Sequence, residues 1–153
     1  PIGQVLAARP AGAATAQVGV IGLGTGSLAA YAGPARRITF YEIDPLVHRL
    51  ATTPRYFTYL SDCGDRCRVV LGDARRSLVR APDQGYDVIA VDAFSSDAIP
   101  VHLLTLEALH LYLRKLADGG VIALHISNRY LALRPVVGEV AAEVTWPAFA
   151  PAR

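Results

Sequence analysis

The sequence of 153 residues has no methionine, only two cysteines and a single lysine, Lys115. Because it has no methionine and opens on Pro1-Ile2-Gly3, we expect that residues upstream of it are missing. No apolar run reaches the roughly 18–20 residues that span a bilayer, and no signal peptide is recognisable. These absences, together with the low cysteine count, favour a cytoplasmic protein.

The two cysteines, Cys63 and Cys67, flank a short polar loop. No second Cys/His pair at metal-binding spacing accompanies them, so we expect free thiols rather than a zinc site or a disulfide. The formal net charge of +2 is too small to indicate nucleic acid or an anionic membrane as a partner. With 52% hydrophobic and 18% charged residues, the chain is typical of a globular protein. We expect one domain over 1–153, with its core in 17–144.

Short apolar segments typical of strands alternate with helical patterns, which predicts an α/β fold with a doubly wound, mostly parallel sheet in the order 3-2-1-4-5. The predicted strands are 18–21, 37–43, 68–71, 86–91 and 121–126. The predicted helices begin after Gly26, at Asp44-Pro45 and after Asp73, and cover 103–116, ended by Asp118-Gly119-Gly120, and 133–144. The sequence stops where such a sheet would still have one or two strands, so we expect truncation at both ends.

A glycine turn, Gly22-Leu23-Gly24-Thr25-Gly26, follows the first predicted strand and precedes a helix. This arrangement lets the backbone approach a ligand closely. A dinucleotide fingerprint requires glycine at residue 27, which is Ser27, so the spacing favours an adenosine-type ligand of the S-adenosylmethionine kind. A turn that serves packing alone is the alternative.

Two acids follow the next two strands. Glu42 lies about 20 residues after the first glycine, where a carboxylate can accept both ribose hydroxyls; the alternative is an exposed charge at a strand end. Asp73, in Gly72-Asp73-Ala74, is placed to reach an adenine amino group or to cap the helix that follows. We assign Asp44 to capping.

The reacting group is expected at the ends of strands four and five. Asp92 ends strand four about one strand spacing (~4.8 Å) from the glycine turn, at the switch point of the sheet. The loop after it adds Asp97, whose alternative role is in a turn, and His125 ends the neighbouring strand, with a buried structural histidine as its alternative.

At these residues the sequence resembles the spermidine synthases, the polyamine aminopropyltransferases. The resemblance rests on four segments in order: Val18–Gly26, Tyr41–Asp44, Gly72–Ala74 and Tyr86–Asp92. Two more, Asp92–Thr105 and His125–Tyr130, look especially like bacterial spermidine synthase-like proteins. The resemblance implies a Rossmann-like class I S-adenosylmethionine methyltransferase fold and transfer of an aminopropyl group from decarboxylated S-adenosylmethionine to a diamine such as putrescine, without a metal.

By motif, the resemblance implies that Gly22, Gly24, Gly26, Glu42 and Asp73 bind the donor. Asp92 would be the catalytic acid at the amine and Asp97 the second acid of the loop, in contact with the substrate. From its place at the end of strand five, we also expect His125 to contact the substrate. Thr25 stands where the family usually carries Asp, which keeps two alternatives open: a methyltransferase that uses intact S-adenosylmethionine, and a non-catalytic relative that only binds the cofactor. A homodimer is left open.

Overall fold

The computed structural model describes residues 2–8, 15–93, 100–125 and 133–143. Its strands are β1 (Ala16–Ile21), β2 (Arg36–Glu42), β3 (Cys67–Leu71), β4 (Tyr86–Val91) and β5 (Leu116–Leu124). Its α-helices are α1 (Ile2–Ala8), α2 (Pro45–Ala51), α3 (Tyr59–Cys63), α4 (Ala74–Val79), α5 (Leu106–Lys115) and α6 (Leu133–Glu143). Three short 3₁₀ helices complete it: η1 (Ser27–Tyr31), η2 (Gly64–Arg66) and η3 (Val101–Leu103).

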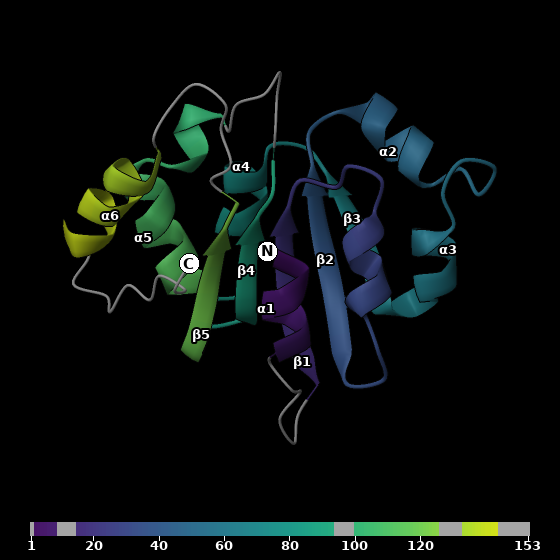
Figure 1. Cartoon of the computed structure of the whole chain (residues 1–153), viewed down its shortest axis with the longest axis horizontal. Helices are drawn as coiled ribbons and strands as arrows, with labels where there is room; N and C mark the ends of the chain where they lie inside the picture. Colours follow the sequence, from purple (N-terminus) through teal and green to yellow (C-terminus); the bar gives the residue numbers. More distant parts are fainter. Residues whose placement is uncertain (1, 9–14, 94–99, 126–132, 144–153) are drawn as a thin grey trace.

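The strands form one parallel sheet in the order β3-β2-β1-β4-β5, as predicted (Figure 1). The change of direction in this order falls between β1 and β4, whose residues pair from Val18 with Val88 to Ile21 with Val91. All five strands therefore end at one edge of the sheet, which we call the carboxyl edge. The switch point lies at the centre of that edge.

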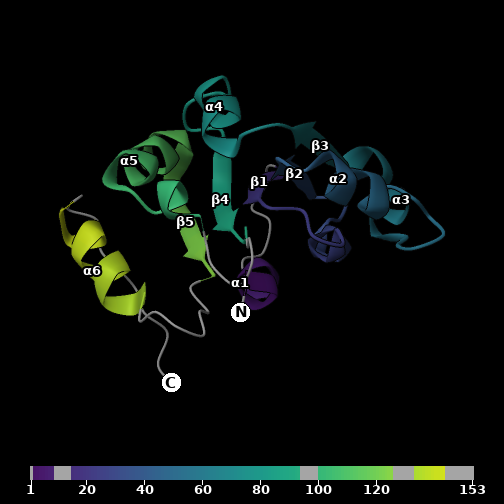
Figure 2. The same ribbon diagram turned by 90° about the horizontal axis from the view of Figure 1, so that it is seen from above.

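Helices cover both faces of the sheet (Figure 2). On one face, α4 and α5 contribute Leu78, Ala108 and Tyr112 to a core cluster with inward residues of the central strands. On the other face, α1, η1, α2 and α3 contribute buried apolar residues to a second cluster. The strand β4 is buried along almost its whole length, as its unbroken apolar sequence predicts, whereas the edge strand β3 has no fully buried residue.

Two predictions at helix ends are wrong. The segment after the glycine turn is a 3₁₀ helix of five residues, not an α-helix. The helix α5 ends at Lys115, and Leu116 already has extended backbone and pairs with Tyr86 in β5. The glycines were predicted to end the helix, but Leu116 is buried in the sheet and the helix ends before it. Gly119 lies in β5, where the register with β4 shifts.

The prediction of free thiols is also wrong, because Cys63 and Cys67 form a disulfide. The helix α3 ends at Cys63, and the single turn η2 returns the chain to Cys67 at the start of β3, which places the two Cα atoms 5.7 Å apart. That separation lies within the range that a disulfide requires. The cysteines thus no longer argue for a reducing compartment.

The sequence reading missed α1 and α3. The helix α1 contributes Ile2 and Leu6, four residues apart, to the second core cluster. In α3, Leu60 packs beside the glycine turn, close to Gly26. Among the helices of the described residues, none is long and apolar enough to cross a membrane.

Candidate functional site

Four residues continue the hydrogen-bond ladder one step past the strand ends at the carboxyl edge. Gly72 N donates to Glu42 O at 2.7 Å, Gly22 N to Tyr41 O at 2.9 Å, Asp92 N to Ile21 O at 2.8 Å and His125 N to Val91 O at 2.9 Å. The backbone therefore fixes the glycine turn, Asp92 and His125 side by side, at the switch point where α/β sheets bind ligands.

The glycine turn packs tightly against the end of β4. A Cβ on Gly22 would lie 2.5 Å from Asp92 O, and Gly22 has φ 99°, a conformation that favours glycine. Gly24 and Gly26 also have positive φ, of 54° and 80°. Glycine at Gly22 is therefore needed for packing against Asp92 as well as for the turn.

Glu42 is not an exposed charge at a strand end, because its relative accessibility is 8%. Its Oε2 accepts a hydrogen bond from Leu23 N at 3.0 Å, and its Oε1 accepts one from Asp44 N at 2.8 Å. The carboxylate thus ties the glycine turn to the end of β2. Each carboxylate oxygen can accept more than one hydrogen bond, so both keep capacity for a ligand's hydroxyl groups.

Asp73 caps α4, since its Oδ1 accepts a hydrogen bond from Arg76 N at 2.8 Å. Its Oδ2 lies 3.7 Å from Nε2 of His102, a residue of η3 that sequence reasoning did not single out. Capping uses one oxygen and holds the side chain in place, so the cap and a ligand contact are compatible. Asp44 caps α2 as predicted, accepting from Leu46 N at 2.7 Å.

The strongest side-chain contact of the site joins Asp92 and His125. Nδ1 of His125 lies 2.6 Å from Oδ1 of Asp92, and both side chains remain about a third exposed, at 34% and 31% respectively. A hydrogen bond of this length in which the carboxylate accepts requires a proton on Nδ1. The sequence placed the two residues at neighbouring strand ends but did not predict that their side chains bond.

Asp97 lies outside the described residues. The chain after that gap is anchored where it re-enters the structure: the buried Tyr112 hydroxyl donates to Leu103 O at 3.1 Å, and Arg75 donates to His102 O at 3.0 Å. Burial raises the pKa of Tyr112 above the usual tyrosine range, so it remains a neutral donor. No sequence pattern predicts a hydrogen bond between a tyrosine hydroxyl and a backbone carbonyl nine residues earlier.

The carboxyl edge therefore joins a tight glycine turn, a buried carboxylate beside it and a carboxylate–imidazole pair. Such a set can hold a polar adenosine-type ligand and can accept a proton at Asp92. No family model matches the chain.

One curated relative, the polyamine aminopropyltransferase of Vibrio vulnificus (strain CMCP6), is 38% identical over 108 residues. The match spans 67% of this chain but only 35% of the relative. The chain therefore covers about a third of the length of that protein.

Solved structures share the fold. A spermidine synthase in complex with the transition-state analogue AdoDATO gives a TM-score of 0.75 at 20% identity, over 94% of this chain and 51% of that one. The spermidine synthase of Thermotoga maritima gives 0.69 at 19%, over 86% and 46%. Human methyltransferase-like protein 13 in complex with SAH gives 0.73 at 25%, over 99% and 69%. The class I S-adenosylmethionine methyltransferase fold is thereby confirmed.

Proposed function

The chain is spermidine synthase-like in sequence and in fold, and we propose from this premise that the whole protein is an aminopropyltransferase. It would move the aminopropyl group of decarboxylated S-adenosylmethionine to a diamine such as putrescine. The observation that supports this most directly is Asp92, held at the switch point by Gly22 on one side and by His125 on the other.

The donor would lie over the glycine turn. Glu42, whose carboxylate is held by the amides of Leu23 and Asp44, would accept hydrogen bonds from the ribose hydroxyls. Asp73, fixed by its cap, would accept from the adenine amino group. The relatives with bound SAH and AdoDATO support a ligand of this chemical class.

The amine would lie beside Asp92. A diamine holds its protons to about pH 10, so one nitrogen must lose a proton before it can attack. Asp92 accepts that proton, and the nitrogen lone pair forms a bond to the carbon attached to the sulfonium sulfur. The carbon–sulfur bond breaks, its electron pair stays on sulfur, and methylthioadenosine leaves. His125 would hold the Asp92 carboxylate in place, and Asp97 would bind the far nitrogen.

A methyltransferase that uses intact S-adenosylmethionine is the second candidate. Thr25 favours it, because an acid at that position of the turn would suit the aminopropyl amine. The similarity to a methyltransferase that binds SAH also supports it. The third candidate is a non-catalytic relative that keeps the donor site without turnover.

The deciding experiment incubates the full-length protein with each sulfonium donor and a panel of amines and identifies products by mass. We expect an aminopropylated amine from the decarboxylated donor and little product from the intact one, because an acidic pocket disfavours an extra carboxylate. A methylated product from the intact donor alone would favour the methyltransferase. Tight methylthioadenosine binding with no product from either donor would favour the binding relative.

Glu42→Gln tests the donor site separately. The variant keeps the size of the side chain but loses charge-assisted hydrogen bonds, so methylthioadenosine should bind about ten- to hundredfold more weakly. Because Glu42 also holds Leu23 and Asp44, melting curves must accompany the titration. Unchanged affinity in a folded variant would remove Glu42 from the binding site.

A further inference from the structure

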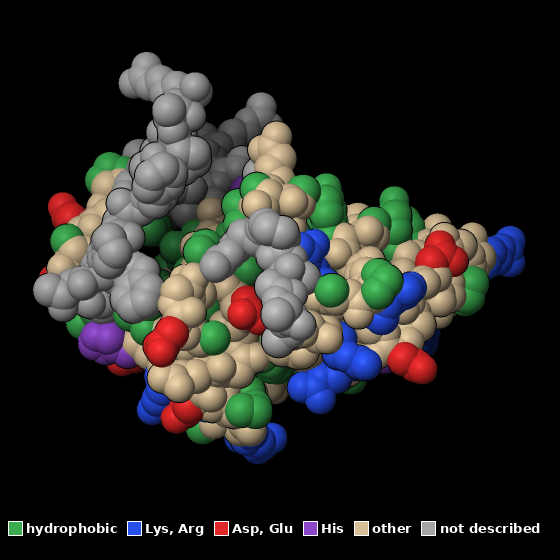
Figure 3. Space-filling view, turned by 90° about the horizontal axis from the view of Figure 1, so that it is seen from below, with side chains coloured by type: hydrophobic (Ala, Val, Ile, Leu, Met, Phe, Trp, Pro, Cys, Tyr) green, Lys and Arg blue, Asp and Glu red, His purple; other side chains and the backbone are tan. Residues whose placement is uncertain are grey.

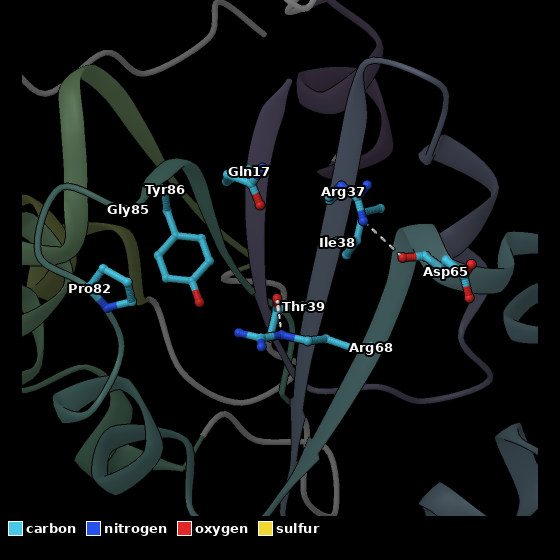
Figure 4. A pocket seen from close by; sticks show the side chains of 9 residues that line it. All are labelled: Gln17, Arg37, Ile38, Thr39, Asp65, Arg68, Pro82, Gly85 and Tyr86. Atoms are coloured by element: carbon cyan, nitrogen blue, oxygen red, sulfur yellow. Dashed lines mark hydrogen bonds between the residues drawn. The ribbon is translucent and has the colours of Figure 1, made fainter. Parts of the chain in front are cut away.

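A hollow of about 390 Å³ opens at the other end of the sheet (Figure 4). It is lined by residues from the first halves of β1 to β4 and from the loops beside them: Gln17, Arg37, Ile38, Thr39, Asp65, Arg68, Pro82, Gly85 and Tyr86. The glycine turn and Asp92 follow the carboxyl ends of β1 and β4, so the hollow is separate from the candidate donor site.

The guanidinium of Arg68 is held over this hollow. Its Nε donates to Oγ1 of Thr39 at 3.0 Å, and Thr39 is buried at 8% accessibility. Figure 4 shows the Arg68 side chain reaching from β3 across β2 toward the side of Tyr86. The bond through Nε restrains the planar group and uses only one of its five N–H donors, so the terminal amino groups keep donors for a ligand. A fixed pair of such donors matches two oxygens of a carboxylate or phosphate.

Arg37 supplies a second cation to the lining. Its guanidinium donates to the backbone oxygen of Asp65 at 3.2 Å, which fixes it at the side of the hollow without neutralising its charge. Asp65 is the one acidic residue in the lining, against two arginines. Figure 3, which views the molecule from this end of the strands, shows Lys or Arg side chains on this face with Asp or Glu side chains among them, so the charge argument rests on the lining itself. The local charge therefore favours an anion.

The wall opposite Arg68 is rigid and partly apolar. The ring of Tyr86 packs on Gly19, where a Cβ would come within 3.3 Å of it, and the Tyr86 hydroxyl lies 2.5 Å from that of Tyr41. Burial and this hydroxyl contact raise the pKa of Tyr41 above the usual tyrosine range, so Tyr41 carries no negative charge that would repel an anion. Pro82 continues the wall beside Tyr86.

We propose that this hollow binds a small oxyanion, a carboxylate or a phosphate group, between Arg68 and the wall of Tyr86, with Arg37 at its side. The site is preformed, because Arg68, Arg37 and Tyr86 are each fixed by a contact within the chain.

The test titrates the full-length protein with sodium phosphate and, in a separate arm, with sodium acetate, at constant ionic strength set by sodium chloride. Proton–nitrogen NMR spectra that include the arginine Nε–H signals report on each guanidinium. We expect saturable shifts of the Arg68 signal. Saturation by phosphate alone identifies a phosphate site, and saturation by acetate identifies a carboxylate site. Shifts that stay linear for both anions would overturn the proposal.

Arg68→Gln and Arg55→Gln form a matched pair, because Arg55 is exposed in the loop between α2 and α3 and does not line the hollow. Arg68→Gln should weaken anion binding about ten- to hundredfold, and Arg55→Gln should leave it unchanged. Arg37→Gln, at an exposed position, should also weaken anion binding. It tests the proposal in place of Arg68→Gln if that variant does not fold. Equal losses in the Arg55 control would overturn the proposal, since they would show a nonspecific effect of charge.

Discussion

Nδ1 of His125 lies 2.6 Å from Oδ1 of Asp92, so the side chains at the ends of two adjacent strands form one unit. The backbone fixes the same two residues, because His125 N donates to the carbonyl of Val91, the residue before Asp92. One carboxylate oxygen is thereby occupied, and the other is the one that would meet an amine.

The pair predicts a specific pattern in His125 variants. His125→Leu should lower kcat about ten- to hundredfold, because the carboxylate loses a charge-assisted hydrogen bond that orients it. His125→Asn should recover most of the activity, since the asparagine amide nitrogen takes nearly the place of Nδ1. Steady-state kinetics measure both variants. If the leucine and asparagine variants lose activity equally, orientation through Nδ1 is not the role of His125.

Gly22 and Gly24 provide a second matched pair. Gly22→Ala should destabilise the protein by at least about 3 kcal/mol, because a steric clash of its Cβ with Asp92 O adds to the strain of a positive φ. Gly24→Ala meets no atom within 4 Å and should cost only about 1–2 kcal/mol from its φ of 54°. Denaturant unfolding measures both. Equal losses would argue against the close approach of the turn to β4.

The disulfide between Cys63 and Cys67 predicts how these two residues react in the purified protein. Peptide mapping after treatment with a thiol reagent in denaturant should find Cys63 and Cys67 unmodified before reduction and both modified afterwards. Removing both cysteines as serine should lower the free energy of unfolding by about 2 kcal/mol, the loop-closure value for so short a loop. Modification of both residues in the unreduced protein would restore the interpretation that the sequence favoured.

Lys115 and Asp83 predict an acid-dependent loss of stability. Nζ of the buried Lys115 donates to Asp83 Oδ1 at 2.6 Å, and this bond holds the pKa of Asp83 below its ordinary value of 3.8. The carboxylate therefore stabilises the fold fully above about pH 4, and the contribution is lost as the pH falls through the lowered pKa. Unfolding curves between pH 2 and 6 should show a smaller acid dependence in Asp83→Asn than in the parent protein.

The sequence predicted the features that capping patterns and the usual topology of α/β folds determine. The strand order follows from the alternation of strands and helices, the cap of Asp44 and the placement of Asp73 follow from capping patterns, and all are confirmed. Contacts between distant elements were not accessible. Lys115 looks like an ordinary basic residue in a last helical turn, yet it is buried. Its Nζ donates hydrogen bonds to the carbonyls of Val79, the last residue of α4, and of Ala81.

The same reason explains the errors. Leu116 joins the sheet instead of extending α5. Local patterns could not predict this, because its partner Tyr86 lies 30 residues earlier in the chain. The pairing of Cys63 with Cys67 depends on the geometry of the turn between them, and the number of residues between two cysteines does not determine that geometry. Glu42 was predicted for a ligand from its distance to the glycines, but its bond to Leu23 shows that this spacing also serves to hold the turn.

Asp92→Asn tests the proposed chemistry most directly. The variant keeps the shape and can still accept a hydrogen bond from Nδ1 of His125, but it cannot take a proton from an amine. General-base catalysis contributes about 10²–10⁴-fold, so kcat with the decarboxylated donor should fall by that factor while methylthioadenosine affinity changes little.

Melting curves separate this role of Asp92 from a supporting one. An Asp92 that only links β4 to β5 would show its deficit as a lower melting temperature, and His125→Leu would then share that deficit. Asp97→Asn is the matched control, because it should raise KM for the amine more than it lowers kcat. An Asp92→Asn enzyme with near-native kcat would refute proton transfer at Asp92, even if the protein makes the aminopropylated product.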